Sequence, residues 1–289
     1  MRENISAGRS KSQIIQATPE DFDRLADFLN LDNLIYRHLD WFGVLDWLGQ
    51  QAFLMEQVDN EIQAFLCVTP ENDDTAWVRA FGVRKVCDPI PSWQRLFNRS
   101  IQILTEKNIR RIAGLGLHPW FTSLLEQSNF VNRQNIVVLE WQNKLPSSEP
   151  PMDKFKIRLM KPQDLEEVAK VDKIAFPSLW QNSLEGLKKA FNLMGVSTVA
   201  TQNEKIIGYQ ISTTMTIYGH LARLAVLPNH QRQGVAFSLV YDLLQKFDER
   251  GLWRVTVNTQ SDNKPSLKLY KKFGFKKTKE EIPAYELNL

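Results

Sequence analysis

The sequence predicts an α/β protein with two similar domains in tandem, each a mixed sheet flanked by helices. The chain has 289 residues, 43% hydrophobic and 24% charged, which is an ordinary globular composition and a length that suits two domains. Short apolar runs alternate with segments of helical periodicity in both halves. The order of these elements in the first half repeats in the second, which indicates an internal duplication.

The first half begins with a polar stretch, residues 1–12, that we expect to be a disordered tail. Thr18 followed by Pro19 is a typical helix start, and we expect helices at 18–29, 37–50, 92–108 and 119–127. Asp59-Asn60 predicts a hairpin turn. Strands are expected at the short apolar runs 12–16, 52–57, 62–69, 77–83, 109–117 and 135–141.

A proline-rich polar segment, NKLPSSEPPMD at 143–153, separates the two halves. Such composition is typical of a linker, so we place the domains at 13–142 and 154–289. Asn203-Glu204 predicts a second hairpin turn. Strands of the second half are expected at 155–159, 196–201, 206–213, 220–226, 253–259 and 283–289. Helices are expected at 162–171 and 183–194 and from residues 234 and 265 onward.

The stretch from His220 to Leu244 combines a strand, a polar connection and a helix. A tight turn into a helix presents unpaired backbone N–H groups, which together with the helix dipole form an anion cradle. Gly234 allows backbone to approach a ligand without an intervening Cβ, and Arg232 adds a positive charge. The predicted ligand is a phosphate or pyrophosphate. The spacing alone fits a plain crossover with a glycine in its loop equally well.

Two motifs in this half are similar to those of a known family. Gln231-x-x-Gly234-x-Ala236, after a strand that ends Val-Leu-Pro, resembles motif A of the GNAT N-acetyltransferases, in which this loop holds the pyrophosphate of acetyl-CoA. The run from Asn263 through Ser266 and Tyr270 to Gly274-Phe275 resembles motif B. The resemblance covers residues 155–289 and implies acetyl-CoA as a co-substrate. The implied contact residues are Leu224, Ala225, Val226, Gln231, Arg232, Gln233, Gly234, Val235, Ala236, Asn258, Asn263, Ser266 and Tyr270.

The resemblance implies acetyl transfer from the thioester to an amine, for which a proton donor and a base are needed. Tyr270 is the candidate donor to the leaving thiolate, because the family usually has a tyrosine near the CoA sulfur; packing in the core is the alternative. His220 is the candidate base, at a strand position where the family often has glutamate, and its ordinary pKa of about 6.5 suits that role. A solvated histidine and a proton path through water remain open. Strand alternation places His220 on the face of Leu224 and Val226, with Arg223 on the other face.

The first half departs from the second at the loop 84–91. This loop has no glycine, and Pro89 and Pro91 remove two N–H donors. The helix expected at 119–127 also has no tyrosine to match Tyr270. We therefore expect a degenerate copy that no longer binds CoA and braces the second domain.

Composition excludes several other functions. A net charge of +3 is too small to indicate a nucleic-acid-binding surface. Two cysteines are too few for a disulfide framework, and the four histidines lack the spacing of metal ligands. Without a signal sequence or an apolar run of membrane length, a cytoplasmic protein is expected. The expected acceptor is an amine of a small molecule or a peptide, and a small amine, amino acid, antibiotic, peptide N-terminus and protein lysine all remain open. Transfer of a longer acyl chain, transfer to a hydroxyl, and a non-catalytic acyl-CoA-binding or regulatory module remain alternatives.

Overall fold

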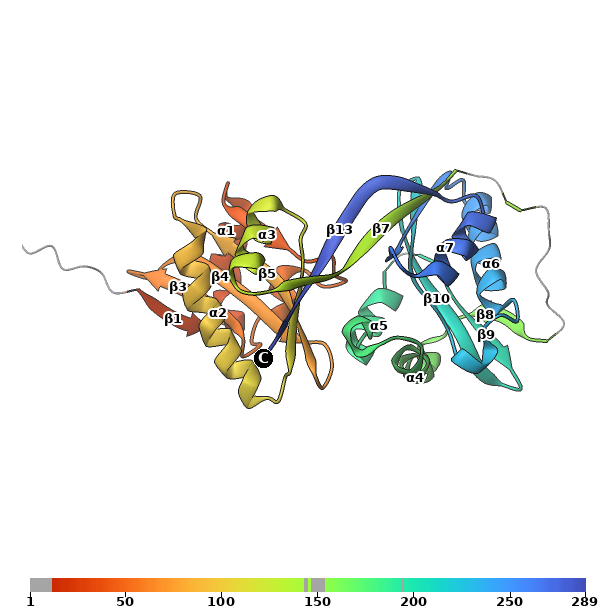
Figure 1. Cartoon of the computed structure of the whole chain (residues 1–289), viewed down its shortest axis with the longest axis horizontal. Coiled ribbons are helices and arrows are strands. Elements are labelled where there is room, and N and C mark those ends of the chain that lie inside the picture. Colours follow the sequence, from red (N-terminus) through yellow and green to blue (C-terminus); the bar gives the residue numbers. More distant parts are fainter. Residues whose placement is uncertain (1–11, 143–144, 147–153, 194) are drawn as a thin grey trace, which may run out of the picture. The chain divides into compact units, whose positions relative to one another are not determined.

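The computed structural model describes residues 12–142, 145–146, 154–193 and 195–289, which form two compact units (Figure 1). The first unit extends to Val131 and includes Glu286–Leu289, and the second comprises Asn132–Tyr285. The expected tail at 1–12 lies outside the described residues except for Ser12. The expected linker at 143–153 also lies outside them, apart from 145–146.

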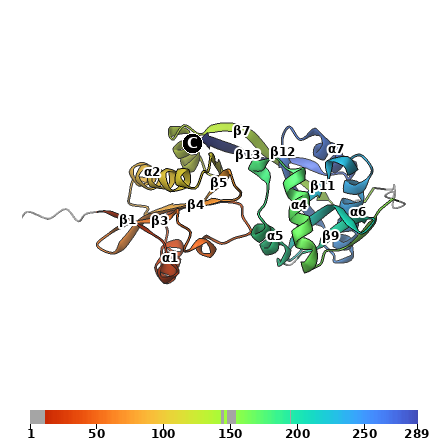
Figure 2. The same cartoon turned by 90° about the horizontal axis from the view of Figure 1, so that it is seen from below.

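The sheet of the first unit has the strand order β1-β3-β4-β5-β6, with β2 beside β5. Helices α1 and α2 lie on opposite sides of β3 and β4 (Figure 2). The strands are β1 (Gln13–Gln16), β2 (Leu34–Arg37), β3 (Phe53–Val58), β4 (Glu61–Pro70), β5 (Thr75–Val83) and β6 (Arg111–Leu115). The helices are α1 (Phe22–Asn30), α2 (Pro89–Glu106) and α3 (Pro119–Gln127), with short 3-10 turns at Pro19–Asp21 and Val44–Trp47.

The sheet of the second unit has the order β8-β9-β10-β11-β12-β7. Figure 1 shows α6 on one side of β10 and α4 and α5 on the other. The strands are β7 (Val131–Gln142), β8 (Lys156–Leu159), β9 (Ser197–Gln202), β10 (Lys205–Met215), β11 (Tyr218–Val226) and β12 (Arg254–Gln260). The helices are α4 (Leu165–Ala175), α5 (Leu184–Phe191), α6 (Val235–Glu249) and α7 (Lys264–Lys272).

Strands β7 and β13 (Lys276–Asn288) depart from the expected domain boundary. We expected residues up to 142 in the first domain, but β7 pairs antiparallel with β12 from Ile136 to Gln142. The last residues of β13 instead belong to the first unit, where the Leu289 N–H donates to the carbonyl of Arg110 at 2.8 Å. The second unit therefore begins within β7, and the first unit includes the remote end of β13, neither of which a composition-based boundary reveals.

The same pairing pattern occurs in both units. β5 runs parallel to β6, and β11 runs parallel to β12, each over a few residues only. Arg79 of β5 has no partner in β4, and Ala222 of β11 has no partner in β10. Each strand therefore has a β-bulge, at the same distance from its C-terminal end. The predicted α/β class, with a mixed sheet in each unit, is confirmed.

Three local expectations have clear outcomes. The hairpin turns at Asp59-Asn60 and Asn203-Glu204 are confirmed, with positive φ at all four residues. The expected helix at 37–50 is wrong, because this range contains only the last residue of β2, Arg37, and a short 3-10 turn at Val44–Trp47. The helix expected from residue 92 begins at Pro89, because the Asp88 carboxylate accepts the Ile90 N–H and caps it.

Candidate active site

The loop before α6 has the backbone geometry of an anion cradle. Gly234 is the N-cap of α6 with φ of 90°, and Arg232 has φ of 61°. Both values lie in the left-handed region, which a residue with a Cβ adopts only at a cost. The turn therefore directs successive N–H groups outward ahead of the helix, where the positive end of the dipole adds to them. Arg232 is exposed beside them.

The side chains of two glutamines in this loop form hydrogen bonds to nearby backbone carbonyls instead of pointing into solvent. The Gln231 side-chain amide donates to the carbonyl of Val226 at 3.2 Å, and that of Gln233 donates to the carbonyl of Asn229 at 2.9 Å. Their side chains are thus bonded within the loop, which leaves their backbone groups as the candidate ligand contacts. Behind the loop, Val235 is buried and packs with Leu239 against the sheet.

The edge of β11 beside the cradle is open. Within the described residues, β12 pairs with β11 only at Tyr218–Leu221, so the edge of Ala222–Val226 that faces away from β10 has no neighbouring strand. Asn258 lies on β12 just beyond the paired residues and is exposed. The two strands diverge here and leave backbone donors and acceptors of β11 for a ligand.

The bulge at Ala222 changes which β11 side chains share a face. We expected His220 on the face of Leu224 and Val226, but one extra residue shifts the alternation. Leu221, Leu224 and Val226 pack in the clusters that contain α6. Arg223 instead bonds Asp172 of α4, so His220 and Arg223 lie on the opposite face. The expected face assignment is therefore wrong.

His220 is largely buried with one ring nitrogen engaged. Its Nδ1 lies 2.8 Å from the Thr256 Oγ1 on β12. Burial lowers the pKa of His220 below its ordinary 6.5. The imidazole is therefore neutral at pH 7 and able to accept a proton.

Tyr270 lies on α7 in the core of the second unit, where it is 4% exposed. Its ring packs against Phe275, with 5.5 Å between the ring centroids. Burial raises the pKa of Tyr270 above its ordinary value, so its hydroxyl keeps its proton at neutral pH. The expected cap of α7 is confirmed: Asn263 Oδ1 accepts the Ser266 N–H at 3.2 Å. This cap fixes the first turn of the helix that carries Tyr270.

A buried polar cluster lies on the face opposite α6, and our sequence reasoning missed it. Asp172 of α4 is fully buried, and its carboxylate accepts bonds from the Arg223 guanidinium at 2.8 Å and from the Tyr209 hydroxyl. The sequence contained one signal for it. Arg223 is a charged residue within an apolar strand, and a buried charge requires a partner.

Two other kinds of site are absent from the part of the chain that the structure describes. It contains no group of three or more histidine, cysteine or acidic residues arranged to hold a metal ion. No helix within the described ranges is long and apolar enough to cross a membrane.

Comparison with known proteins finds similarity in the sequence of the second unit. Residues 165–275 match the acetyltransferase (GNAT) family. N-alpha-acetyltransferase 30 of Schizosaccharomyces pombe is 29% identical over 97 residues, 32% of this chain and 64% of that protein. The ribosomal protein bS18-alanine N-acetyltransferase of Escherichia coli K12 is 29% identical over 75 residues, 26% of this chain and 51% of that protein. The chain thus spans about half to two thirds of these relatives.

Solved structures resemble the whole chain. A tandem GNAT protein from the clavulanic acid biosynthesis pathway has a TM-score of 0.64 at 10% identity, with 96% of this chain and 98% of that chain covered. A GCN5-related N-acetyltransferase from Sphaerobacter thermophilus has a TM-score of 0.60 at 14% identity, with 96% and 95% covered. At these identities the likeness establishes the GNAT fold and nothing more specific.

Proposed function

We propose that this protein is an acetyl-CoA-dependent N-acetyltransferase of the GNAT type, and that its second unit carries out the reaction. The observation that carries the proposal is the left-handed turn at Gly234, which leads into α6 directly beside the open edge of β11. The turn is suited to a pyrophosphate and the strand edge to the amide-containing arm of the same molecule. The match of residues 165–275 to the GNAT family supports this assignment.

The residues present fit acetyl-CoA. Gly234 has no Cβ to fill the cradle, and Arg232 is an exposed cation next to it. We assign the backbone of Gln231–Ala236 to the pyrophosphate, and Leu224–Val226 with Asn258 to the arm. Asn263 and Ser266 lie at the start of α7 and complete the proposed site. Bound there, acetyl-CoA supplies an activated acetyl group as a thioester.

The chemistry follows from the protonation states. We assign neutral His220, directly or through water, to remove a proton from the amine as its nitrogen bonds to the acetyl carbon. The carbon–sulfur bond breaks, and Tyr270 gives its retained proton to the thiolate. A backbone N–H near Val226 polarises the carbonyl. Fixing amine and thioester side by side provides much of the acceleration.

The acceptor we propose is the α-amino group of a peptide or protein. The support is the similarity to N-alpha-acetyltransferase 30 and to the ribosomal protein bS18-alanine N-acetyltransferase. Synthetic peptides with different first residues are the direct test. Release of free CoA thiol with peptides, but not with their N-terminally blocked forms, is the expected result.

We further propose that the first unit is a degenerate GNAT copy that binds no CoA. Its β4 pairs along one edge of β5, from Ala76 to Val83. On the other edge, β6 pairs with Thr75–Trp77 and β2 pairs with Ala80–Val83. β2 thus fills the place that lies open beside Ala222–Val226 in the second unit.

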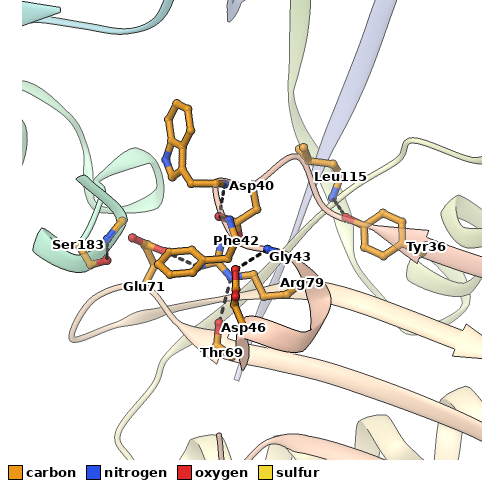
Figure 3. Close-up of polar contacts among 12 residues, drawn as sticks. Tyr36, Asp40, Phe42, Gly43, Asp46, Thr69, Glu71, Arg79, Leu115 and Ser183 are labelled. Atoms are coloured by element: carbon orange, nitrogen blue, oxygen red, sulfur yellow. Dashed lines mark hydrogen bonds and ion pairs between the residues drawn. The ribbon is translucent and has the colours of Figure 1, made fainter. Parts of the chain in front are cut away.

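The side chain of Tyr36 on β2 occupies the space between β2, β6 and α3. Its hydroxyl accepts the Leu115 N–H of β6 at 3.3 Å, as Figure 3 shows. Its ring stacks on Phe121 of α3, with 3.6 Å between the centroids. The strand edge, the end of β6 and the space between them are therefore occupied by the protein itself, which supports the loss of a cofactor site in this unit.

Calorimetric titration with acetyl-CoA tests both parts of this proposal. We expect one molecule to bind per chain, because within the described residues only the second unit has an open strand edge beside a cradle. Two molecules per chain would contradict the degenerate first unit. Absence of binding would contradict the proposed function as a whole.

Replacing Tyr270 by phenylalanine removes the proposed proton donor and keeps the buried ring. We expect Tyr270→Phe to bind acetyl-CoA with unchanged affinity and to lower kcat by about a hundredfold, within the usual range for general acid–base groups. Tyr241→Phe is the matched control, because Tyr241 packs against the same core from α6. Equal turnover of both variants and the wild type at every pH would remove Tyr270 from the mechanism.

Replacing His220 tests the base. Because burial lowers the pKa of His220, the wild-type rate should stay constant as the pH falls to 6.5 and decline only below it, where the imidazole becomes protonated. We expect His220→Ala to lower kcat by about a hundredfold and to abolish this decline. Thr256→Val removes only the bond to Nδ1 and should retain the decline. An unshifted pH profile in His220→Ala would favour a water-relayed path.

A further inference from the structure

His220 and Thr256 face each other at the end of the paired part of β11 and β12. The two residues are partners in the parallel register of these strands, and the Nδ1 atom of His220 lies 2.8 Å from the Thr256 Oγ1. The pairing ends one residue later, at Leu221 and Val257, where the open edge of β11 begins. The contact therefore fixes the imidazole directly beside the opening in which we place the acetyl-CoA arm.

Thr256 is held on a strand that is paired on both sides. β12 also pairs antiparallel with β7, where Glu140 lies opposite Thr256. Two residues earlier on β12, Arg254 forms an ion pair with Glu140 at 2.6 Å, and its guanidinium lies 5.5 Å from the centre of the Tyr218 ring on β11. These contacts join the three strands, and the branched Cβ of threonine restricts its χ1 angle. The Thr256 hydroxyl is therefore a fixed partner for the imidazole.

The contacts of Thr256 indicate which ring nitrogen of His220 carries the proton. A hydroxyl can donate or accept, so the distance between Oγ1 and Nδ1 alone permits either tautomer. Burial has the largest effect on the pKa of His220 and lowers it, while a hydrogen bond with the backbone of Thr256 raises it. A backbone group raises this pKa when its carbonyl accepts a ring N–H, because that bond stabilises the imidazolium. The ring thus directs a protonated Nδ1 at Thr256, which leaves Nε2 unprotonated in the neutral form.

The charged groups near His220 are already paired with one another. Within the described residues, the titratable side chains on this face of the sheet around His220 are Tyr209, Tyr218 and two ion pairs, Arg223–Asp172 at 2.7 Å and Arg254–Glu140 at 2.6 Å. Apart from Asp172, the buried residues of α4 and α5 are not titratable. Thr213 of β10, the partner of His220 on its other side, is uncharged. Burial and the bonds to Thr256 therefore decide the protonation of His220.

We propose that Thr256 is a positioning residue that selects the His220 tautomer protonated at Nδ1, so that Nε2 is the atom that takes the proton of the acceptor amine. The proposal rests on the proposed acetyltransferase function, in which His220 is the base. As the amine proton bonds to Nε2, the Nδ1 proton stays in its bond to Thr256, which stabilises the imidazolium. A ring in the other tautomer would present a proton at Nε2 where the reaction requires a lone pair.

Nitrogen-15 chemical shifts of the imidazole test the tautomer without any acceptor. The signals of His220 in the labelled full-length protein are identified by their loss in His220→Ala. At about pH 8, where the ring is neutral, we expect a protonated Nδ1 and an unprotonated Nε2. The reverse pattern would overturn the proposal.

The pKa of His220, followed by the same shifts, tests the direction of the bond. Thr256→Val keeps the side-chain shape and removes the hydroxyl. Loss of an acceptor from Nδ1–H destabilises the imidazolium, so the pKa of His220 should fall by about 0.5–1 pH units. A hydroxyl that donates to Nδ1 would stabilise the neutral ring, and its removal would raise the pKa instead. A rise or an unchanged pKa would therefore overturn the role of Thr256.

Two further variants are the controls. Thr256→Ser keeps the hydroxyl and should retain both the tautomer and the pKa of the wild type. Thr213→Val removes a threonine hydroxyl beside His220 on β10, on the side away from Thr256, and should also leave the pKa of His220 unchanged. A fall in pKa in Thr213→Val equal to that in Thr256→Val would show that added apolar surface, rather than the lost bond, is the cause.

Turnover tests the consequence for catalysis. Thr256→Val should lower kcat by about three- to tenfold, because part of the ring population adopts the other tautomer, while the KM for the acceptor and the Kd for acetyl-CoA change less than about twofold. Thr256→Ser should restore kcat to within about twofold of the wild type. Unchanged kcat in Thr256→Val would overturn the positioning role. A wild type that has the expected tautomer but acetylates no amine contradicts the proposed function instead, and the spectra still decide which nitrogen Thr256 protonates.

Discussion

Gly234→Asp should lose acetyl-CoA binding by about a hundredfold or more. A carboxylate at the N-terminus of α6 would face the pyrophosphate, and like charges about 4 Å apart repel by about 1–4 kcal/mol at a protein surface. An L-residue forced to φ of 90° adds about 1–3 kcal/mol of strain, which shifts the loop or its N–H groups. Since 1.4 kcal/mol is a tenfold change, the two effects together account for the expected loss.

Two control variants separate the causes of this loss. Gly251 has φ of 72° after α6, and a Cβ there meets nothing within 4 Å, so Gly251→Asp introduces similar strain and the same charge away from the cradle. It should retain wild-type affinity by calorimetry. Gly234→Asn has no charge and tolerates positive φ better than most residues, so it should bind with intermediate affinity. Equal losses in Gly234→Asp and Gly251→Asp would show that instability rather than the cradle is responsible.

The parts of the site that sequence predicts correctly depend on local geometry. A glycine between a strand and a helix predicts a tight turn into that helix, and the turn at Gly234 is left-handed. Asn263, three residues before Ser266, predicts the cap found on α7. Both are set by backbone conformation within a few residues. Asp59-Asn60 and Asn203-Glu204 are predictable for the same reason.

The parts that sequence does not predict depend on partners remote in the chain. No strand was expected at 34–37, and these residues form β2 because they pair with β5. The bulge at Ala222 has no local sequence mark, although it reverses the face on which His220 lies. The sequence predicts strands at β7 and β13, but not the unit to which each belongs. That is decided by pairing with residues more than a hundred positions away in the chain. Long-range pairing therefore sets the face of β11 that carries the proposed base, while local geometry sets the turn that we propose holds acetyl-CoA.

The first unit gives the other large expected effect. Arg79 lies at the bulge of β5 and forms ion pairs with Asp40 and Glu71 (Figure 3). Its side chain is only 5% exposed, so water screens these ion pairs little. Its Nε donates to Thr69 Oγ1 at 3.0 Å, and its guanidinium lies 4.9 Å from the Trp47 ring. These contacts secure the segment after β2, and so secure β2 in the place beside β5.

Arg79→Leu should destabilise the protein by about 3–5 kcal/mol, measured by urea denaturation, because two buried carboxylates lose their cation. Arg84→Leu is the control, since Arg84 pairs with Glu61 on the surface and should change stability by no more than about 1 kcal/mol. Burial already raises the pKa of Asp40, and without Arg79 it rises further. A folded-state pKa above the unfolded value penalises folding at high pH, and this penalty disappears as the pH falls and the carboxyl takes up a proton. The deficit of Arg79→Leu should therefore shrink from pH 7 toward pH 4, and a deficit independent of pH would show that lost packing, rather than uncompensated charge, causes it.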